Sequence, residues 1–462
     1  MLQYRNKGAN MTTSKRVILK KTWQLASTLT LSRSLIMLAS FLGVMMIARI
    51  SHTTLAASGL ISATQALIFV VSMSMLFSIG PVVGHAFSGG RKKEVGSIFQ
   101  QACLLAIVIG LIGTMVMLHV KTILLAFHQD PQLVTIVQSY FHMYIFGFTP
   151  MMIMMACQQI VLATNKQKFV LFTSLWNLTV MLFLAYVLIY GKFGVHRFGV
   201  PGLSLAYAIN AWIVLGIYFI YLKTDPSFKK YDLFTWRISS NFHIFKKLVK
   251  IGWPITLQGA SDLFSFFIVV IMVGWIGEYA LAAQQIVTQY FLLLVIPLFG
   301  LSQASSILIG QARGAKAYTD VKAYGNTVLC IGFGFSIFVV IAFVLFPREL
   351  IMLYLSESHP EHINQIIHLA RIVLIMTGFR ILFDSSVEIL VGSLRGLYDT
   401  KWPMMLSIIL TWAFGIPLAY VLGFILKWGL VGITISGILG MIIISIILWY
   451  RWMWQNKKLA TC

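Results

Sequence analysis

Acidic residues are scarce in this chain, which has 13 Asp and Glu against 35 Lys and Arg in 462 residues. Charged residues make up only 10% of the chain, while 59% of the residues are hydrophobic. No soluble domain needs so much apolar surface, and the recurring apolar runs of about 20 residues are long enough to cross a bilayer as helices. They lack the alternation that is typical of membrane β-strands. The composition therefore predicts an all-α polytopic membrane protein.

Several functional motifs are also missing. The four cysteines, Cys103, Cys157, Cys330 and Cys462, have neither Cys-x-x-Cys spacing nor the pattern of a disulfide framework. There is no Gly-Lys-Ser/Thr phosphate loop and no His-Glu-x-x-His metal motif. We therefore expect no metal, no cofactor and no ATP site. A membrane-embedded enzyme or a channel stays open only as a weaker alternative.

The basic residues cluster between the apolar runs, which argues against nucleic-acid binding despite a net charge of +22. With the N-terminus in the cytoplasm, 26 of the 35 basic residues fall on cytoplasmic segments and helix ends, six on the opposite side and three within helices. This imbalance predicts that both termini are cytoplasmic. Membrane lipid is the expected partner of the basic loops.

The apolar runs predict twelve membrane-spanning helices. Their approximate bounds are 25–50, 54–86, 97–120, 132–163, 169–191, 199–222, 245–276, 281–312, 322–346, 363–394, 402–426 and 429–453. Residues 1–21 are mostly polar and basic, so we expect no removable signal peptide and expect the first helix to act as the insertion signal. We expect a multi-pass protein of the bacterial inner membrane.

The longest polar gap divides the chain into two halves of similar length. The predicted parts are a cytoplasmic segment at 1–24, an N-lobe at 25–222, a cytoplasmic linker at 223–243, a C-lobe at 244–455 and a cytoplasmic tail at 456–462.

The two lobes share short motifs at nearly constant spacing. Leu55-Ala56-Ala57 matches Leu281-Ala282-Ala283 at an offset of 226 residues, and Gly199-Val200-Pro201-Gly202 corresponds to Gly429-Leu430-Val431-Gly432 at an offset of 230. Six helices per lobe make this a parallel repeat with pseudo-symmetry about the membrane normal. Transporters of this plan bind substrate in a central cleft between the lobes and alternate which side is open.

Asp262 lies deep in an apolar run, ten residues after Gly252, which is roughly 15 Å into a hydrocarbon core about 30 Å thick. A carboxylate at that depth costs about 2.5 kcal/mol or more to insert, so we expect it to face a cavity and to bind substrate or ion. A hydrogen-bonded packing role is the alternative. Pro254, about two turns earlier, is the best hinge candidate, although a packing kink is the commoner role of a helix proline.

Asp384 and Glu388 are the other two acids deep inside an apolar run. Arg380 lies one turn before Asp384 and Glu388 one turn after it, so the three side chains share a helix face. An acid between a cation and a second acid can hold and release a proton or cation, as a coupling site must. A static Arg380–Asp384 ion pair is the alternative.

Arg33 lies eight residues into the first predicted span. It either extends to the cytoplasmic surface or faces the cleft. In the cleft, Arg33 and Arg380 would disfavour simple organic cations and would admit anionic or zwitterionic compounds.

Motifs in the C-terminal half can be compared with a known family. They are Gly252-Trp253-Pro254 with Asp262, Gly310-Gln311-Ala312-Arg313-Gly314-Ala315, and Phe383-Asp384 followed by Gly392-Ser393-Leu394-Arg395-Gly396. In order and spacing they resemble the multidrug and toxic compound extrusion (MATE) family, over nearly the whole chain. The resemblance implies twelve helices in two lobes and a buried acid in helix seven.

The N-terminal half departs from the family pattern. Gly43 stands where the family often has an aspartate, and Met181 stands where an asparagine is usual. Within residues 1–220 the only acids are Glu94 and Asp130, both expected at loop edges. Coupling through an N-terminal carboxylate is therefore not expected.

We expect a monomeric secondary exporter, not an enzyme, that moves drug-like compounds in antiport with protons or sodium by rocker-switch alternating access. Protons are favoured because Arg380 would compete with a metal cation for Asp384. A flippase or exporter of lipid-linked or anionic compounds in the same superfamily is the alternative.

Overall fold

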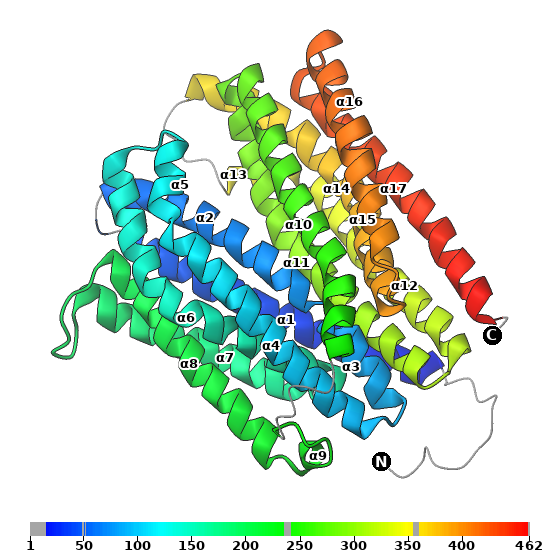
Figure 1. The fold of residues 1–462 in the computed structure, drawn as a ribbon. Helices are drawn as coiled ribbons and strands as arrows, with labels where there is room; N and C mark the ends of the chain where they lie inside the picture. Colours follow the sequence, from blue (N-terminus) through cyan, green and yellow to red (C-terminus); the bar gives the residue numbers. More distant parts are fainter. Residues whose placement is uncertain (1–14, 49, 51, 235–241, 354–359, 461–462) are drawn as a thin grey trace. The chain divides into compact units, whose positions relative to one another are not determined.

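A computed structural model describes residues 15–48, 50, 52–234, 242–353 and 360–460 (Figure 1). Within this part of the chain the structure has helices and no strands, and twelve helices are long and apolar enough to cross a membrane. The helical form follows from the apolar sequence, because a helix satisfies its own backbone hydrogen bonds where water is absent. The predicted all-α fold with twelve spans is confirmed.

The structure has these elements in chain order: α1 (Lys15–Ala48), α2 (His52–Leu76), α3 (Ile79–Ser88), α4 (Lys92–Leu118), α5 (Val120–Ala126), α6 (Pro131–Ala163), α7 (Gln167–Tyr190), α8 (Val200–Thr224), α9 (Pro226–Lys229), α10 (Phe242–Ile276), α11 (Glu278–Gly314), α12 (Tyr318–Leu345), α13 (Pro347–Met352), α14 (Pro360–Gly396), α15 (Lys401–Ile409), a π-helical turn (Leu410–Gly415), α16 (Ile416–Tyr420), a second π-helical turn (Val421–Ile425) and α17 (Gly429–Ala460).

Two predicted spans are less regular than expected. The second span breaks between α2 and α3, one turn before Pro81, which sits in the first turn of α3 where a missing N–H costs little. The eleventh span contains two π-helical turns on either side of Pro417. In addition, α1 begins at Lys15, so the described part of the predicted cytoplasmic segment 1–24 is helical.

Packing groups the chain into two compact units, which we call the N-unit (Thr28–Ala260) and the C-unit (residues 1–27 with Ser261–Cys462). The division falls inside α1 and α10. The predicted linker 223–243 lies partly outside the described residues, at 235–241, as do residues 1–14 of the predicted N-terminal segment and the last two of the tail. The predicted lobe boundaries stay a prediction.

In the N-unit, α6 is the central helix, and it packs against α2, α3, α4 and α8. Its buried aromatic side chains Tyr140, Phe141 and Phe148 form much of the core together with Tyr218 of α8. Burying large aromatic side chains supplies extensive close packing between these helices.

In the C-unit, α14 takes the central place and packs against α11, α12 and α17. The contact with α11 is close because it uses small residues, with Gly392 against the backbone of Ser302. Ser302 Oγ donates to the Glu388 carbonyl oxygen at 2.7 Å, and the hydroxyls of Ser305 and Ser393 are 2.7 Å apart. This contact fixes the rotation of α14 and therefore the direction of its charged face.

The backbone of the two units repeats. Asn165 after α6 and Tyr398 after α14 are both left-handed, with φ of 62° and 66°, and in each case the next N–H bonds to a carbonyl five residues earlier. Gly202 in α8 and Gly432 in α17 each lie directly against the backbone of the preceding span. Equivalent positions are thus 233 residues apart in α6 and α14, and 230 apart in α8 and α17.

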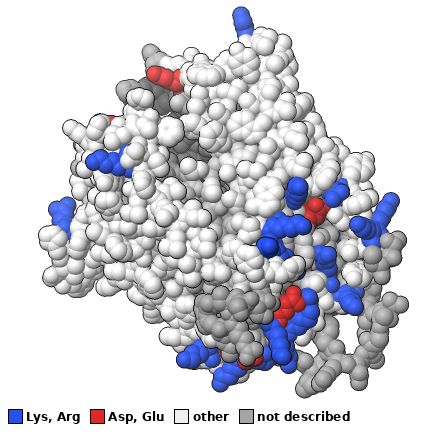
Figure 2. Space-filling view, in the orientation of Figure 1, with Lys and Arg blue, Asp and Glu red and all other residues white. Residues whose placement is uncertain are grey.

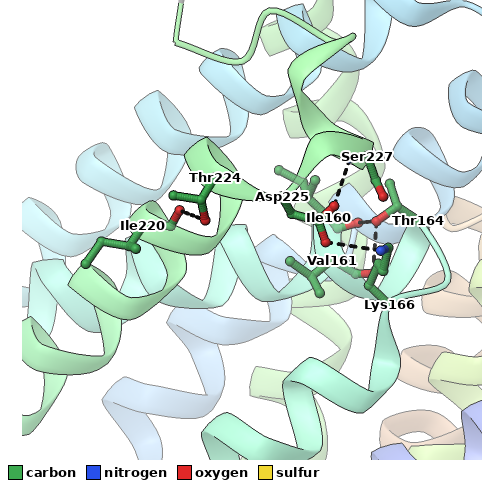
Figure 3. Close-up of polar contacts among 8 residues, drawn as sticks. All are labelled: Ile160, Val161, Thr164, Lys166, Ile220, Thr224, Asp225 and Ser227. Atoms are coloured by element: carbon green, nitrogen blue, oxygen red, sulfur yellow. Dashed lines mark hydrogen bonds and ion pairs between the residues drawn. The ribbon is translucent and has the colours of Figure 1, made fainter.

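The loop after α6 is tied to the end of α8 (Figure 3). Lys166 Nζ lies 3.1 Å from Asp225 Oδ2, and Asp225 Oδ1 accepts a 2.8 Å hydrogen bond from the Ser227 N–H. Burial acts to raise the pKa of Asp225, but the hydrogen bonds from Ser227 and Lys166 outweigh it and lower that pKa to about 2.

Lys and Arg side chains gather in a few groups on a surface that is otherwise largely uncharged (Figure 2). This distribution is the one that the sequence predicts for the loops and helix ends of a multi-pass membrane protein. The cytoplasmic placement of the termini stays a prediction.

Candidate functional site

Four charged side chains follow one face of α14: Arg380, Asp384, Glu388 and Arg395. They extend over roughly 22 Å at 1.5 Å per residue. The sequence predicted the first three as a group. It did not single out Arg395 for this face, because its position near the end of the run made it look like one more basic residue at a helix end.

Arg380 and Asp384 form an ion pair, with 3.2 Å between Nε and Oδ2. The Asp384 side chain is 7% exposed and the Arg380 side chain 31% exposed. Among the described residues, neither of these two atoms has a hydrogen-bond partner in normal geometry. The buried oxygen therefore keeps an unused acceptor position, which costs free energy unless a proton or another donor fills it.

Three helices surround the guanidinium of Arg380. Its Cζ atom lies 5.3 Å from the centre of the Phe291 ring on α11, within the range of a cation–π interaction. On the α17 side, a Cβ added to Gly437 would come within 3.3 Å of Nη1. Sequence reasoning missed Phe291 and Gly437, because nothing local in the sequence relates them to Arg380.

Asp262 of α10 is exposed, and the carboxylates of Glu388 and Asp384 are close enough to interact with it electrostatically. The structure thus brings together the three acids that the sequence singled out. Next to Asp262, the Ser261 hydroxyl accepts a 2.8 Å hydrogen bond from Trp412 Nε1. This bond ties α10 to the span that contains the π-helical turns.

Glu388 also interacts electrostatically with Arg395. The acids are therefore flanked by an arginine at each end of the face. When all five groups are ionised, three carboxylates and two guanidiniums leave one excess negative charge. Such a cluster attracts one proton or one monovalent cation.

The other two predicted residues, Arg33 and Pro254, belong to the N-unit. Arg33 lies in the N-unit, roughly 27 Å along α1 from its start at Lys15, with its guanidinium 5.2 Å from the Phe77 ring centre. Pro254 is buried in the first half of α10, also in the N-unit, close to where Gly252 packs against Met75. The roles of Arg33 in a cleft and of Pro254 as a hinge stay predictions.

The two departures in the N-terminal half lie side by side. A Cβ added to Gly43 would meet the Met181 methyl at 2.8 Å and the Leu203 side chain at 2.9 Å, with the Tyr207 hydroxyl at 3.5 Å. The space that an acid at position 43 would need is therefore filled by apolar groups and a phenol.

Neutral hydrogen bonds connect the helices near this point. Gln65 on α2 accepts from the Tyr140 hydroxyl at 2.9 Å and donates to the Tyr144 hydroxyl at 3.1 Å. The Tyr144 hydroxyl in turn donates a hydrogen bond to Met151 Sδ at 3.9 Å.

The two N-terminal acids that the sequence predicted at loop edges lie at helix starts. Glu94 is in the first turn of α4, and Asp130 caps the N-terminus of α6.

Comparison with known proteins shows similarity over most of the chain. The sequence model of the MatE family matches residues 29–187 and 254–421. The probable multidrug resistance protein NorM of Rhizobium meliloti is 29% identical over 413 residues, covering 88% of this chain and 87% of that protein. Its namesake from a Synechococcus strain is 26% identical, covering 93% and 92%.

Solved structures share the fold. A MATE protein in its bent conformation superposes with a TM-score of 0.87 at 16% identity, covering 98% of this chain and 99% of that one. An outward-facing multidrug resistance MATE family transporter gives a TM-score of 0.86, also at 16% identity, covering 98% and 100%. A transporter of the MOP superfamily from Pyrococcus furiosus gives 0.85 at 15% identity with the same coverage.

Proposed function

We propose that this chain, which belongs to the MatE family, is a secondary active exporter that carries drug-like organic compounds across the membrane in antiport with protons. Family membership makes it a transporter, and its curated relatives are named as multidrug resistance proteins. The proposal assigns it to the bacterial inner membrane as a monomer with both termini in the cytoplasm. Alternating access of two lobes, with Pro254 as a hinge, would move the substrate.

The single observation that carries the coupling proposal is the acid cluster of Asp262, Asp384 and Glu388 in the C-unit. Its excess negative charge attracts a cation, and Asp384 has a buried oxygen with no hydrogen bond of normal geometry among the described residues. A proton bound there removes the excess charge. Binding and release of that proton would bias the transporter toward one conformation or the other.

Protons are a better coupling ion here than sodium. The guanidinium of Arg380 already lies 3.2 Å from Asp384 Oδ2, and a metal cation at this oxygen would be repelled by it at short range. A proton needs only one oxygen and no ligand shell. With Asp384 protonated, the two remaining carboxylates, those of Asp262 and Glu388, balance the guanidiniums of Arg380 and Arg395.

The test is efflux of a fluorescent organic cation from proteoliposomes under an imposed pH gradient, with and without a sodium gradient. We expect proton-driven efflux by the wild type and loss to the background rate in Asp384→Asn, which removes the carboxylate at nearly constant volume. Met151→Leu is the matched control, because Met151 occupies the equivalent position in α6. Proton-driven efflux that survives in Asp384→Asn would contradict the assignment of coupling to this cluster.

Export of anionic or lipid-linked compounds is the second candidate. It is favoured by the two half-buried arginines, Arg33 and Arg380. It is also favoured by the structural neighbour from Pyrococcus furiosus, whose binding pocket is described as having reversed polarity. Absence of cation efflux by the wild type under either gradient would favour this candidate.

A further inference from the structure

We propose that Arg380 is a tethered cation that occupies an organic-cation subsite formed by the Asp384 carboxylate and the Phe291 ring, and that a cationic substrate group must displace it to bind. The inference deepens the proposed export function and rests on it. Its central claim concerns binding, which can be measured without transport.

The two partners of the guanidinium are those that recognise organic cations. A carboxylate supplies the opposite charge, and an aromatic face supplies the attraction of its quadrupole for ammonium and guanidinium groups. Here they come from different helices, Asp384 from α14 and Phe291 from α11, and converge on one point at 3.2 Å and 5.3 Å from the Arg380 side chain. With Arg380 moved away, the same two groups would face a ligand.

The pairing is loose enough to be exchanged. Arg380 Nε and Asp384 Oδ2 lie within ion-pair distance, but neither has a hydrogen-bond partner in normal geometry among the described residues. The guanidinium is also the more exposed partner, at 31% against 7% for the acid. A ligand that approaches Asp384 therefore meets the guanidinium first, on a long side chain that can turn aside.

Gly437 on α17 makes the room that the guanidinium occupies. A Cβ there would be 3.3 Å from Nη1, closer than an ordinary van der Waals contact. In the N-unit the large and small residues are exchanged between the two helices. Gly147 on α6 stands at the position equivalent to Arg380, and Tyr207 on α8 stands at the position equivalent to Gly437. At these described positions the repeat provides space for a cationic group in the C-unit, where Gly437 stands, and fills it with Tyr207 in the N-unit.

Removal of the tethered cation should open the subsite. Arg380→Gln keeps a polar side chain, shorter and uncharged, and leaves the acids with two excess negative charges instead of one. A monovalent lipophilic cation should then bind more tightly, because it no longer competes with a covalently attached guanidinium. Arg380→Lys should give a smaller gain, because an ammonium still pairs with Asp384 but lacks the planar fork of arginine.

The experiment measures binding of tetraphenylphosphonium to the purified full-length protein in nanodiscs by titration calorimetry. We expect affinity about tenfold higher in Arg380→Gln than in the wild type, and a return to the wild-type value or below in the double variant Arg380→Gln/Asp384→Asn. Unchanged or weaker binding in Arg380→Gln, with an unfolding temperature close to that of the wild type, would overturn the proposal.

Gly437→Ala provides a test that changes no charge. The added methyl should push the guanidinium from its place and raise the affinity about two- to threefold, and it carries the test if Arg380→Gln does not fold. The two proposals fail separately. A wild type that exports nothing under a proton gradient contradicts the transport function, whereas equal affinities in the wild type, Arg380→Gln and Gly437→Ala contradict the tethered cation.

Discussion

The central helices α6 and α14 end in the same left-handed turn and hold the same place in their units, but their side chains differ in kind. The equivalent pairs around them, N-unit first, are Gln65 and Phe291, Gly147 and Arg380, Met151 and Asp384, and Tyr207 and Gly437. In the N-unit these positions hold a glutamine, a glycine, a thioether and a phenol, and the Tyr144 hydroxyl forms neutral hydrogen bonds with both Gln65 and Met151. In the C-unit they hold an ion pair beside an aromatic ring.

The difference teaches that the fold does not require charge at this place. In the N-unit the neutral side chain of Gln65 connects the helices at this place, because its amide forms hydrogen bonds with the hydroxyls of Tyr140 and Tyr144. The ionised groups of the C-unit cost desolvation energy that the N-unit avoids. Since the scaffold folds without them, the charges are best explained by function.

The largest expected effect comes from placing the acid in the wrong unit. Met151→Asp puts a carboxylate at the position equivalent to Asp384, where no arginine accompanies it. We expect a loss of about 2 kcal/mol in the free energy of unfolding, because the new acid must be desolvated or protonated. Denaturant unfolding in detergent micelles measures it, with Met151→Leu as the control.

Adding the arginine as well should not rescue this variant. In Gly147→Arg/Met151→Asp the new side chain would start 2.9 Å from the Ala208 Cβ, and Tyr207 fills the space that Gly437 leaves open in the C-unit. A double variant as stable as the wild type would show that the N-unit accommodates the ion pair of the C-unit, and would contradict this expectation.

The fold was predictable from the sequence to the extent that membrane helices are. Apolar length gives the spans because the bilayer leaves the backbone few other choices. The π-helical turns around Pro417 and the break before α3 were missed, because proline can be absorbed by a kink, a wider turn or a new helix start. Pro81 was the available signal for the break.

For the site, periodicity was enough to place Arg380, Asp384 and Glu388 on one face, since one helix carries all three. Asp262 came from its depth in the membrane. Phe291 and Gly437 could not be found in this way, because they reach Arg380 only through the packing of three helices. The internal repeat relates these positions to the N-unit but does not say which side chains touch.

An intermediate effect is expected at the loop ends, where the two units use ion pairs of reversed polarity. In the N-unit the loop supplies Lys166 and the last helix region supplies Asp225, whereas in the C-unit the loop supplies Asp399 and α17 supplies Arg451. Asp399 Oδ2 lies 2.8 Å from Arg451 Nε and accepts a 2.7 Å hydrogen bond from Gln455. Each pair ties a loop to the helix that closes its unit.

Because the pKa of Asp225 is lowered to about 2, its contribution to stability depends on pH. The contribution is fully present above the unfolded pKa of about 4 and is lost as the pH falls through the folded pKa of about 2. After allowance for solvent screening, we expect the lowered pKa of Asp225 to contribute about 1 kcal/mol to the free energy of unfolding at neutral pH. The difference in unfolding temperature between the wild type and Asp225→Asn should therefore shrink as the pH falls from 5 to 2. A difference that stays constant over this range would contradict the assigned pKa shift.

The smallest effect separates two tyrosines of the neutral cluster. The Tyr207 hydroxyl is buried and has no hydrogen-bond partner in normal geometry among the described residues, although Ser40 lies nearby. Its removal in Tyr207→Phe should change the free energy of unfolding by less than about 0.5 kcal/mol, or stabilise the protein, because no hydrogen bond is lost. Tyr144→Phe should cost about 1 kcal/mol, because the Gln65 amide loses its acceptor. Thermal unfolding of both variants measures the contrast, and equal costs would mean that the cluster extends through Tyr207 to the position where the family often has its N-terminal acid.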